Sequence, residues 1–224
     1  YDKKLIYKGY TIQPYSPKAG TGLSSHELNQ PGCYQDVTDT TVTAQFETLN
    51  ETLPPQLQDE TPLHILAWTT TPWTLPSNTA LTVGPSIDYV VVSTFNRYTH
   101  LPIRVLLAKD LVPRVFAKVF QQVGAKDDLL SYDEKGKNIP YLITDEVKGT
   151  ALVGIRYKQL WSDAPLPHNT PEHAFRVITG DFVTTDDGTG IVHTAPTFGA
   201  DDAVVDAARG LVVLRRVREV EGLL

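Results

Sequence analysis

The stretch LHILAWTTTPWTLPSN, residues 63–78, decides the fold. Its first half, residues 63–68, is a mostly apolar run that predicts a buried strand, and three threonines carry the β-branched character on to Pro72. Pro72 lacks a backbone donor and biases the residue before it towards an extended conformation, so the strand should end there. The three threonines then lie at a strand end, where binding and catalytic groups are commonly placed. A strand end of this kind is also common as plain structure, and this stretch alone favours a structural turn.

A second stretch near the other end of the chain changes that balance. It reads DDGTGIVHTAPTFGADD, residues 186–202, and contains a glycine turn, a short apolar strand, a histidine, a proline-bounded loop and an acidic pair. Glycine at Gly188 and Gly190 permits a turn that side chains would block. This second group of polar and turn residues shifts the balance for the first stretch from a structural turn towards a functional role.

WTTTPWTLPSN and GTGIVHTAPTFGADD together resemble the paired signature of the editing domain that is inserted in isoleucyl-tRNA synthetases. The related valyl and leucyl enzymes carry TTRP-type versions of the first motif without the second tryptophan. They also lack the histidine followed by Thr-Ala-Pro in the second motif. The lead-in segments 12–17 and 21–28 resemble the sequence before that insertion, so the resemblance runs from about Tyr10 to Asp202 and fades beyond it.

The resemblance and the strand pattern predict the same architecture. Many short strands, separated by turn signals and accompanied by one or two helices, favour a mainly β fold with helices. The resemblance implies the β-barrel-like fold of valyl, isoleucyl and leucyl editing domains, with residues 1–224 as one domain. Segments at about 1–20 and 205–224 would link this domain to an absent catalytic body.

Hydrophobic periodicity places the expected elements. Strands are expected at 39–47, 63–68, 79–83, 88–95 with a hairpin partner in 98–107, 139–144, 148–157 and 174–178. A helix is expected to start near Ala108, to carry an apolar stripe through Phe120 and to end near Gly124. A second helix is expected at 203–209, in the region where the resemblance has faded.

Composition limits the class of protein. The chain has 224 residues, of which 41% are hydrophobic and 21% charged, a range typical of one sizeable globular domain. Cys33 is the single cysteine, and no Cys/His cluster has zinc spacing, so no metal and no cofactor are expected. No apolar run approaches the length of about 20 residues that a membrane span needs, and no signal peptide is evident at the start. A cytoplasmic monomer without membrane contact is therefore expected.

Two further features of the sequence bear on its partners. The chain contains no methionine, which predicts a fragment of a longer protein, and nothing resembles the HIGH or KMSKS motifs of synthetase active sites, so amino-acid activation is not expected. The net charge of −6 argues against a general nucleic-acid binder but leaves room for a docked RNA end. The resemblance implies two partners, the rest of the isoleucyl-tRNA synthetase and the 3′ end of its tRNA carrying valine.

The resemblance assigns roles to the acidic and apolar residues of the two motifs. Asp202 would pair with the α-ammonium of the misattached amino acid, since charge-assisted hydrogen bonds are the strong kind. An ordinary acid at a helix N-terminus is the alternative for this position. His193 would line the pocket for the side chain, with Trp73 as an apolar wall. Isoleucyl enzymes are a standard case in which a second, smaller pocket admits valine and excludes the correct isoleucine.

The hydroxyl and amide groups would handle the ester and the water. Thr70, Thr71 and Thr74 offer hydroxyls to the terminal adenosine, the carbonyl or the water, whereas strand alternation sends Thr69 to the face opposite Thr70. Asn78 would position the same water or brace the loop. By the resemblance, Gly199 would let the backbone approach the substrate. No nucleophile–base pair stands out, so direct attack by a positioned water is expected.

Three functions are therefore in competition. The first is hydrolysis of valyl-tRNA specific for isoleucine, with valyl-adenylate as a possible second substrate. The second is a binding module that docks the tRNA acceptor end without turnover. The third is an unrelated metal-dependent hydrolase that uses His193, Asp202 and His64, although these residues lack a recognisable metal-ligand spacing.

Overall fold

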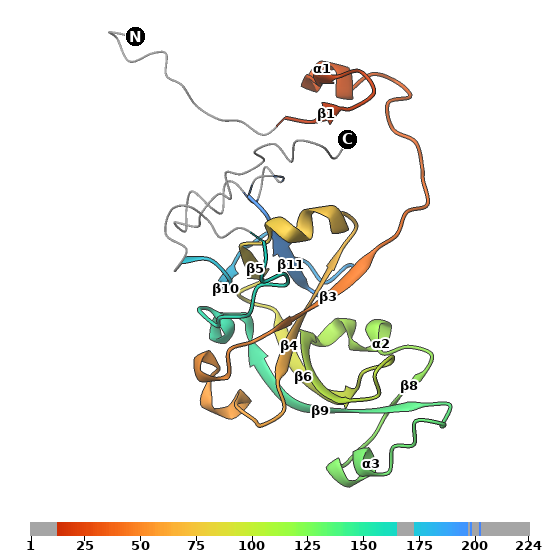
Figure 1. Ribbon diagram of the computed structural model, residues 1–224, viewed down its shortest axis with the longest axis vertical. Helices are drawn as coiled ribbons and strands as arrows, with labels where there is room; N and C mark the ends of the chain where they lie inside the picture. The colour runs from red at the N-terminus through yellow and green to blue at the C-terminus, as the bar shows by residue number, and fades with distance from the viewer. Residues whose placement is uncertain (1–12, 165–172, 197, 199–201, 203–224) are drawn as a thin grey trace.

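A computed structural model describes residues 13–164, 173–196, 198 and 202. Within this part the chain is mainly β with short helices, as the sequence predicts (Figure 1). The helix expected at 203–209 and the linking segments expected at about 1–20 and 205–224 lie outside the described residues, except for 13–20.

The larger of the sheets has six strands. Their order is β3 (Val42–Glu47), β4 (Leu63–Thr69), β7 (Pro102–Ala108), β6 (Asp88–Phe95), β9 (Ile139–Lys148) and β8 (Phe120–Gln122). Strands β6 and β7 form the expected antiparallel hairpin, whereas β4 pairs with β7, and β8 with β9, in parallel. Strand β4 ends at Thr69, and the turn η3 (Pro72–Ser77) follows, so the strand end predicted before Pro72 is confirmed.

The smaller sheet has three strands, in the order β10 (Arg176–Thr179), β5 (Ala80–Val83) and β11 (Ile191–Thr194). The central strand β5 runs parallel to β10 and antiparallel to β11. Near the N-terminus, β1 (Tyr15–Ser16) pairs with β2 (Thr21–Gly22), and α1 (Ser25–Leu28) follows. Residues 29–41 are exposed and form no helix or strand before β3 begins (Figure 1).

The core lies on both faces of the six-stranded sheet. One face sends alternate residues such as Ile65 and Val91 towards the small sheet, where they meet Leu81 and Val177. The opposite face buries a second set that includes Val92. Burial on both faces explains why β6 and β7 read as nearly continuous apolar runs and do not alternate with polar residues.

The long helix expected at 108–124 is wrong. The segment forms a 3₁₀ turn, η4 (Lys109–Leu111), one turn of α-helix, α2 (Val112–Val115), and then strand β8. Lys118 has a φ of 65°, which ends any helical path, and β8 pairs with β9 through Phe120 and Ile139. β-branched and aromatic residues have weak helix propensity, so pairing with an open sheet edge decided the structure. A short helix, α3 (Lys126–Leu130), follows.

The two strands expected at 139–144 and 148–157 are also partly wrong. Residues 139–148 form one continuous strand, β9, and the chain then turns through η5 (Gly149–Leu152). A Cβ on Gly149 would lie 2.0 Å from the backbone oxygen of Gly84, so only glycine permits this close approach of two chain segments. Tyr157 makes only an isolated bridge, to Thr48. Two further 3₁₀ turns, η1 (Asn50–Thr52) and η2 (Pro55–Leu57), lie between β3 and β4.

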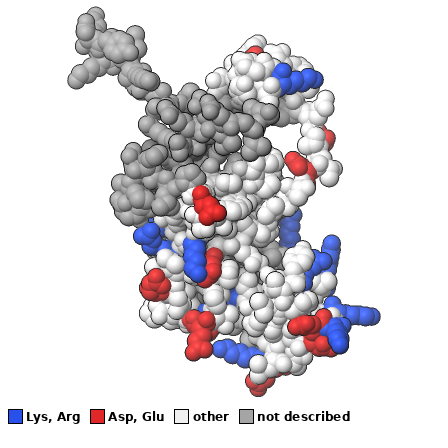
Figure 2. All heavy atoms as spheres, viewed as in Figure 1, with Lys and Arg blue, Asp and Glu red and all other residues white. Residues whose placement is uncertain are grey.

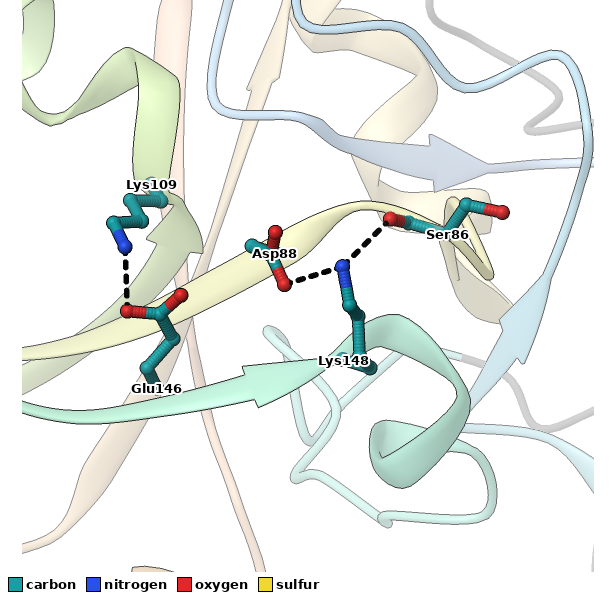
Figure 3. A network of polar contacts seen from close by, with 5 residues as sticks. All are labelled: Ser86, Asp88, Lys109, Glu146 and Lys148. Carbon is teal, nitrogen blue, oxygen red and sulfur yellow. Dashed lines mark hydrogen bonds and ion pairs between the residues drawn. The ribbon is translucent and has the colours of Figure 1, made fainter.

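Two ion pairs lie where β6 begins and β9 ends (Figure 3). Lys148 Nζ lies 2.7 Å from Asp88 Oδ1 across the two strands and donates to the Ser86 carbonyl at 3.3 Å. Lys109 Nζ, from η4, lies 2.6 Å from Glu146 Oε2. All four charged side chains are about half exposed, and surface pairs of this kind contribute about 0–1 kcal/mol. The strand register therefore depends mainly on the buried faces.

Candidate functional site

The two sequence motifs meet through the small sheet. After η3 the chain passes through Asn78 directly into β5, and β5 pairs antiparallel with β11, which carries His193. In this register Leu81 lies opposite His193. Thr79 donates its backbone N–H to the Thr194 carbonyl at 3.1 Å, so pairing continues into the motif. Residues far apart in the sequence are thereby fixed side by side.

A cleft of about 570 Å³ opens where the motifs meet. Most of the residues expected at the site line it, namely Thr69, Thr70, Thr71, Trp73, Thr74, His193 and Asp202. Asn78 is 4% exposed and is not among the lining residues. Gly199 lies outside the described residues.

The threonine hydroxyls form a connected array. Thr71 Oγ1 lies 3.2 Å from Thr69 Oγ1 and 3.4 Å from Thr74 Oγ1. The Thr71 backbone N–H donates to Thr69 Oγ1 at 3.0 Å, and the Thr74 hydroxyl donates to the Thr71 carbonyl at 2.8 Å. Strand alternation predicts opposite faces for Thr69 and Thr70, but β4 ends at Thr69 and both residues line the same cleft.

His193 is held at both ring nitrogens. Its Nε2 lies 3.0 Å from Thr74 Oγ1, and its Nδ1 lies 2.9 Å from Asn78 Nδ2. The side chain is 8% exposed, and this burial lowers the pKa of the imidazole to about 4. His193 is therefore neutral at pH 7.

Asp202 brings a carboxylate to the same cleft. Its Oδ2 accepts the backbone N–H of Ala195 at 2.8 Å, which fixes the side chain against the loop that follows β11. The side chain is partly buried. The cleft therefore combines a carboxylate, an array of hydroxyls and a neutral histidine, a set that suits an ammonium-bearing ester and a water molecule.

Comparison with known proteins agrees with the resemblance of the two motifs. The chain is 57% identical over 220 residues to the isoleucine–tRNA ligase of Bacteroides fragilis (strain ATCC 25285), covering 98% of this chain and 18% of the relative. It is 41% identical over 218 residues to the isoleucine–tRNA ligase of Clostridium tetani, covering 97% of this chain and 17% of the relative. The chain belongs to the isoleucine–tRNA ligase family. It spans less than a fifth of the length of these curated relatives, and no family model matches it.

A solved structure places the fold. The crystal structure of GlLeuRS-CP1 superimposes with a TM-score of 0.50 at 16% sequence identity, covering 75% of this chain and 57% of that chain. At this identity the likeness concerns the fold alone. The expected fold class, that of synthetase editing domains, is confirmed.

Several residues that line the cleft of this ligase segment were missed from the sequence. Phe182 and Phe198 are 39% and 48% exposed, and like Trp73, which is 65% exposed, they present aromatic surface at the cleft. Asp187 also lines the cleft and forms a 2.9 Å ion pair with Arg114. Phe198 and Asp187 belong to the second motif, residues 186–202, and this could have marked them as candidate cleft residues. Phe182 follows a turn and carries no such signal.

The metal-dependent alternative loses one of its ligands. His64 lies at a different cavity, beside Glu47 and Lys158, and not at the cleft. Among residues 13–164, 173–196, 198 and 202, no group of three metal-binding side chains is close enough to hold an ion.

No helix in the described part of the ligase segment is long and apolar enough to cross a membrane. Acidic and basic side chains are interspersed on the described part of the face in Figure 2.

A glycine in the second motif is expected to be essential for packing. Gly190 has a φ of 70°, and an added Cβ would lie 2.4 Å from the Ala108 Cβ. We expect Gly190→Ala to lower the free energy of unfolding by about 2 kcal/mol, from left-handed strain and the clash. Urea denaturation measures this. Gly124→Ala is the control, because nothing lies within 4 Å of its Cβ position, and a comparable loss there would contradict the prediction.

Proposed function

We propose that this ligase segment hydrolyses the ester bond of valine misattached to the isoleucine-accepting tRNA. The reaction removes the wrong amino acid and leaves the tRNA free for a second charging. Valyl-adenylate is a second candidate substrate, because it presents the same α-ammonium and side chain. The rest of the synthetase would supply most of the tRNA contacts, since the chain spans only 18% of its relatives.

The observation that carries the proposal is the shared cleft. Asp202, Thr70 and Thr71 line one cavity although they come from two motifs that are far apart in the sequence. The carboxylate would bind the α-ammonium group, and the hydroxyls would hold the ester and the attacking water. A cavity of about 570 Å³ lies in the range of small-molecule sites, so it has room for more than an amino-acid side chain.

The aromatic rim suits the end of the tRNA. Trp73, Phe182 and Phe198 expose ring surface at the cleft. Bases stack on such rings with a gain of about 1–3 kcal/mol each. We assign the rim to the terminal adenosine and the interior beside His193 to the amino-acid side chain. This moves Trp73, expected as a wall of the side-chain pocket, to the adenosine, because it is 65% exposed. Steric exclusion of the extra methylene of isoleucine then provides selectivity.

The test is deacylation of valyl-tRNA and isoleucyl-tRNA, both made on the isoleucine-accepting tRNA, at high concentrations of the chain. Selective loss of the valyl ester is expected. Asp202→Ala should slow it about 10- to 100-fold, the equivalent of one hydrogen bond to a charged group. Asp186→Ala is the matched control, because Asp186 is exposed and does not line the cleft.

A binding module without turnover is the competing function. It is favoured by one observation, the occupation of both His193 ring nitrogens, which leaves no evident base on that side chain. Saturable binding of the tRNA with no loss of either ester would support the binding module. Equal hydrolysis by the chain and by Asp202→Ala would contradict the proposed role of the carboxylate.

A further inference from the structure

A chain of buried polar side chains runs from the core to the cleft. The Tyr157 hydroxyl lies 2.7 Å from Asn78 Oδ1, and Asn78 Nδ2 lies 2.9 Å from His193 Nδ1. His193 Nε2 lies 3.0 Å from Thr74 Oγ1. All four residues are at least nine-tenths buried. Tyr157 and Asn78 do not line the cleft, so they can act on it only through His193 and Thr74.

The partners of Asn78 fix its orientation. Its side chain also contacts the Ala80 carbonyl at 2.8 Å, and a carbonyl can only accept a hydrogen bond. The atom that faces Ala80 and His193 is therefore the amide nitrogen, and the amide oxygen accepts from the Tyr157 hydroxyl. A flipped amide would place two oxygens against each other at Ala80.

That orientation assigns the proton of His193. Because Asn78 donates to Nδ1, this nitrogen carries the lone pair and the ring proton is on Nε2. Nε2–H then donates to Thr74 Oγ1, whose own proton goes to the Thr71 carbonyl. Each donor in this series of hydrogen bonds, from Tyr157 to Thr74, has one acceptor. The buried, neutral state of the imidazole agrees with this assignment, because a protonated Nδ1 would face an N–H donor.

Tyr157, the first residue of this hydrogen-bonded series, is held rigidly in the core. Its ring lies edge to face between Phe46 and Phe175, with centroid distances of 5.2 and 6.1 Å. Its backbone N–H donates to the Phe175 carbonyl at 3.0 Å. The side chain is 2% exposed, and burial raises the pKa of the phenol well above its ordinary value, so the hydroxyl keeps its proton. A rigid donor therefore stands behind Asn78.

We propose that Tyr157 and Asn78 are positioning residues that hold His193 as its Nε2–H tautomer. His193 then acts as a hydrogen-bond donor that orients the Thr74 hydroxyl, and it is not the base of the hydrolysis. The catalytic consequence depends on the proposed function, whereas the tautomer does not. A change of tautomer would reverse the hydrogen bond at Thr74 and disturb the hydroxyl array that Thr74 shares with Thr71.

Nitrogen-15 NMR of the labelled chain at pH 7 tests the tautomer directly, because protonated and unprotonated ring nitrogens have well-separated chemical shifts. The His193 signals are identified among the six histidines by their loss in His193→Gln. We expect a protonated Nε2 and an unprotonated Nδ1. A carboxylate cannot donate, so Asn78→Asp should move the proton to Nδ1. An Nδ1–H tautomer in the unaltered chain would overturn the proposal, as would an unchanged tautomer in folded Asn78→Asp.

Tyr157→Phe tests the anchor without loss of ring packing. It should lower kcat for valyl-ester hydrolysis about 5- to 10-fold, the equivalent of one neutral hydrogen bond, and leave KM nearly unchanged because Tyr157 does not touch the cleft. Tyr141→Phe is the control, since Tyr141 is also buried, at 7% exposed against 2% for Tyr157, and its hydroxyl bonds Gln122 at 3.5 Å, away from the cleft. Equal kcat in Tyr157→Phe and Tyr141→Phe would overturn the role of Tyr157.

The two readouts separate this inference from the proposed function. An Nε2–H tautomer in a chain that hydrolyses neither ester would support the proposed tautomer and refute the proposed function. Selective hydrolysis by a chain with the Nδ1–H tautomer would refute the inference and leave the function standing. Circular dichroism shows whether Asn78→Asp folds. If it does not, the tautomer of the unaltered chain and the kinetics of Tyr157→Phe still test the proposal.

Discussion

Acidification from pH 7 to pH 4 is expected to lower the free energy of unfolding by about 3 kcal/mol through His193 alone. The pKa of His193 is about 4 in the folded chain and about 6.5 when unfolded. Between these values the unfolded chain binds a proton that the folded chain does not bind, so stability falls as the pH falls. The contribution is complete above pH 6.5 and is lost by pH 4, at about 1.4 kcal/mol for each pH unit.

His193→Gln isolates this effect because an amide does not titrate. Urea denaturation at pH 7, 5.5 and 4 should show a shallower loss of stability in the variant than in the unaltered chain. His64, whose pKa burial also lowers, titrates in both proteins and cancels in the difference. A difference below about 1 kcal/mol between pH 7 and pH 4 would mean that water or a counter-ion reaches the protonated ring.

Phe46→Ala is expected to cost about 3–5 kcal/mol of stability, the usual range for a large aromatic removed from a packed core. The Phe46 side chain is fully buried on β3 within the cluster that lies between the two sheets. Its ring also supports Tyr157 edge to face. The variant leaves a cavity next to the anchor of the buried chain of polar groups, and rigid strands on both sides cannot close it.

Urea denaturation with an unchanged slope measures the loss. Tyr98→Ala is the control, because Tyr98 is 83% exposed and its removal should change stability by less than about 0.5 kcal/mol. A loss below about 1 kcal/mol in Phe46→Ala would contradict the packing between the sheets.

Strands with strong apolar patterns and proline boundaries could be predicted from the sequence. β4 and its end before Pro72 follow from local chemistry, and so does the hairpin of β6 and β7. The helix expected at 108–124 could not be excluded locally, because its apolar spacing fits a helix as well as a turn followed by a strand. The left-handed residue Lys118 and the pairing of β8 with β9 are tertiary choices.

The cleft was predictable only as far as its motifs reach. Thr74 and His193 were expected together on the strength of the paired signature, and the structure brings them to 3.0 Å. Asn78 is expected either to position the water or to brace the loop, and its side chain contacts the Ala80 carbonyl and His193. Tyr157 could not be predicted as part of the site from the sequence. Its hydrogen-bond partner Asn78 is 79 residues away, and the stretch 148–157 has the pattern of an ordinary strand. Hydrogen-bond networks leave no periodic trace in a sequence.

The pairing of β5 with β11 has a consequence for the order in which the molecule assembles. The hairpin of β6 and β7 joins neighbouring segments and can close early, whereas Thr82 and Thr194 of the small sheet bond across 112 residues. Loop closure over such a distance is entropically costly, so contacts of this kind form late. During synthesis the core strands can therefore pair while the cleft is still incomplete, and His193 can meet Thr74 only after residue 194 has left the ribosome.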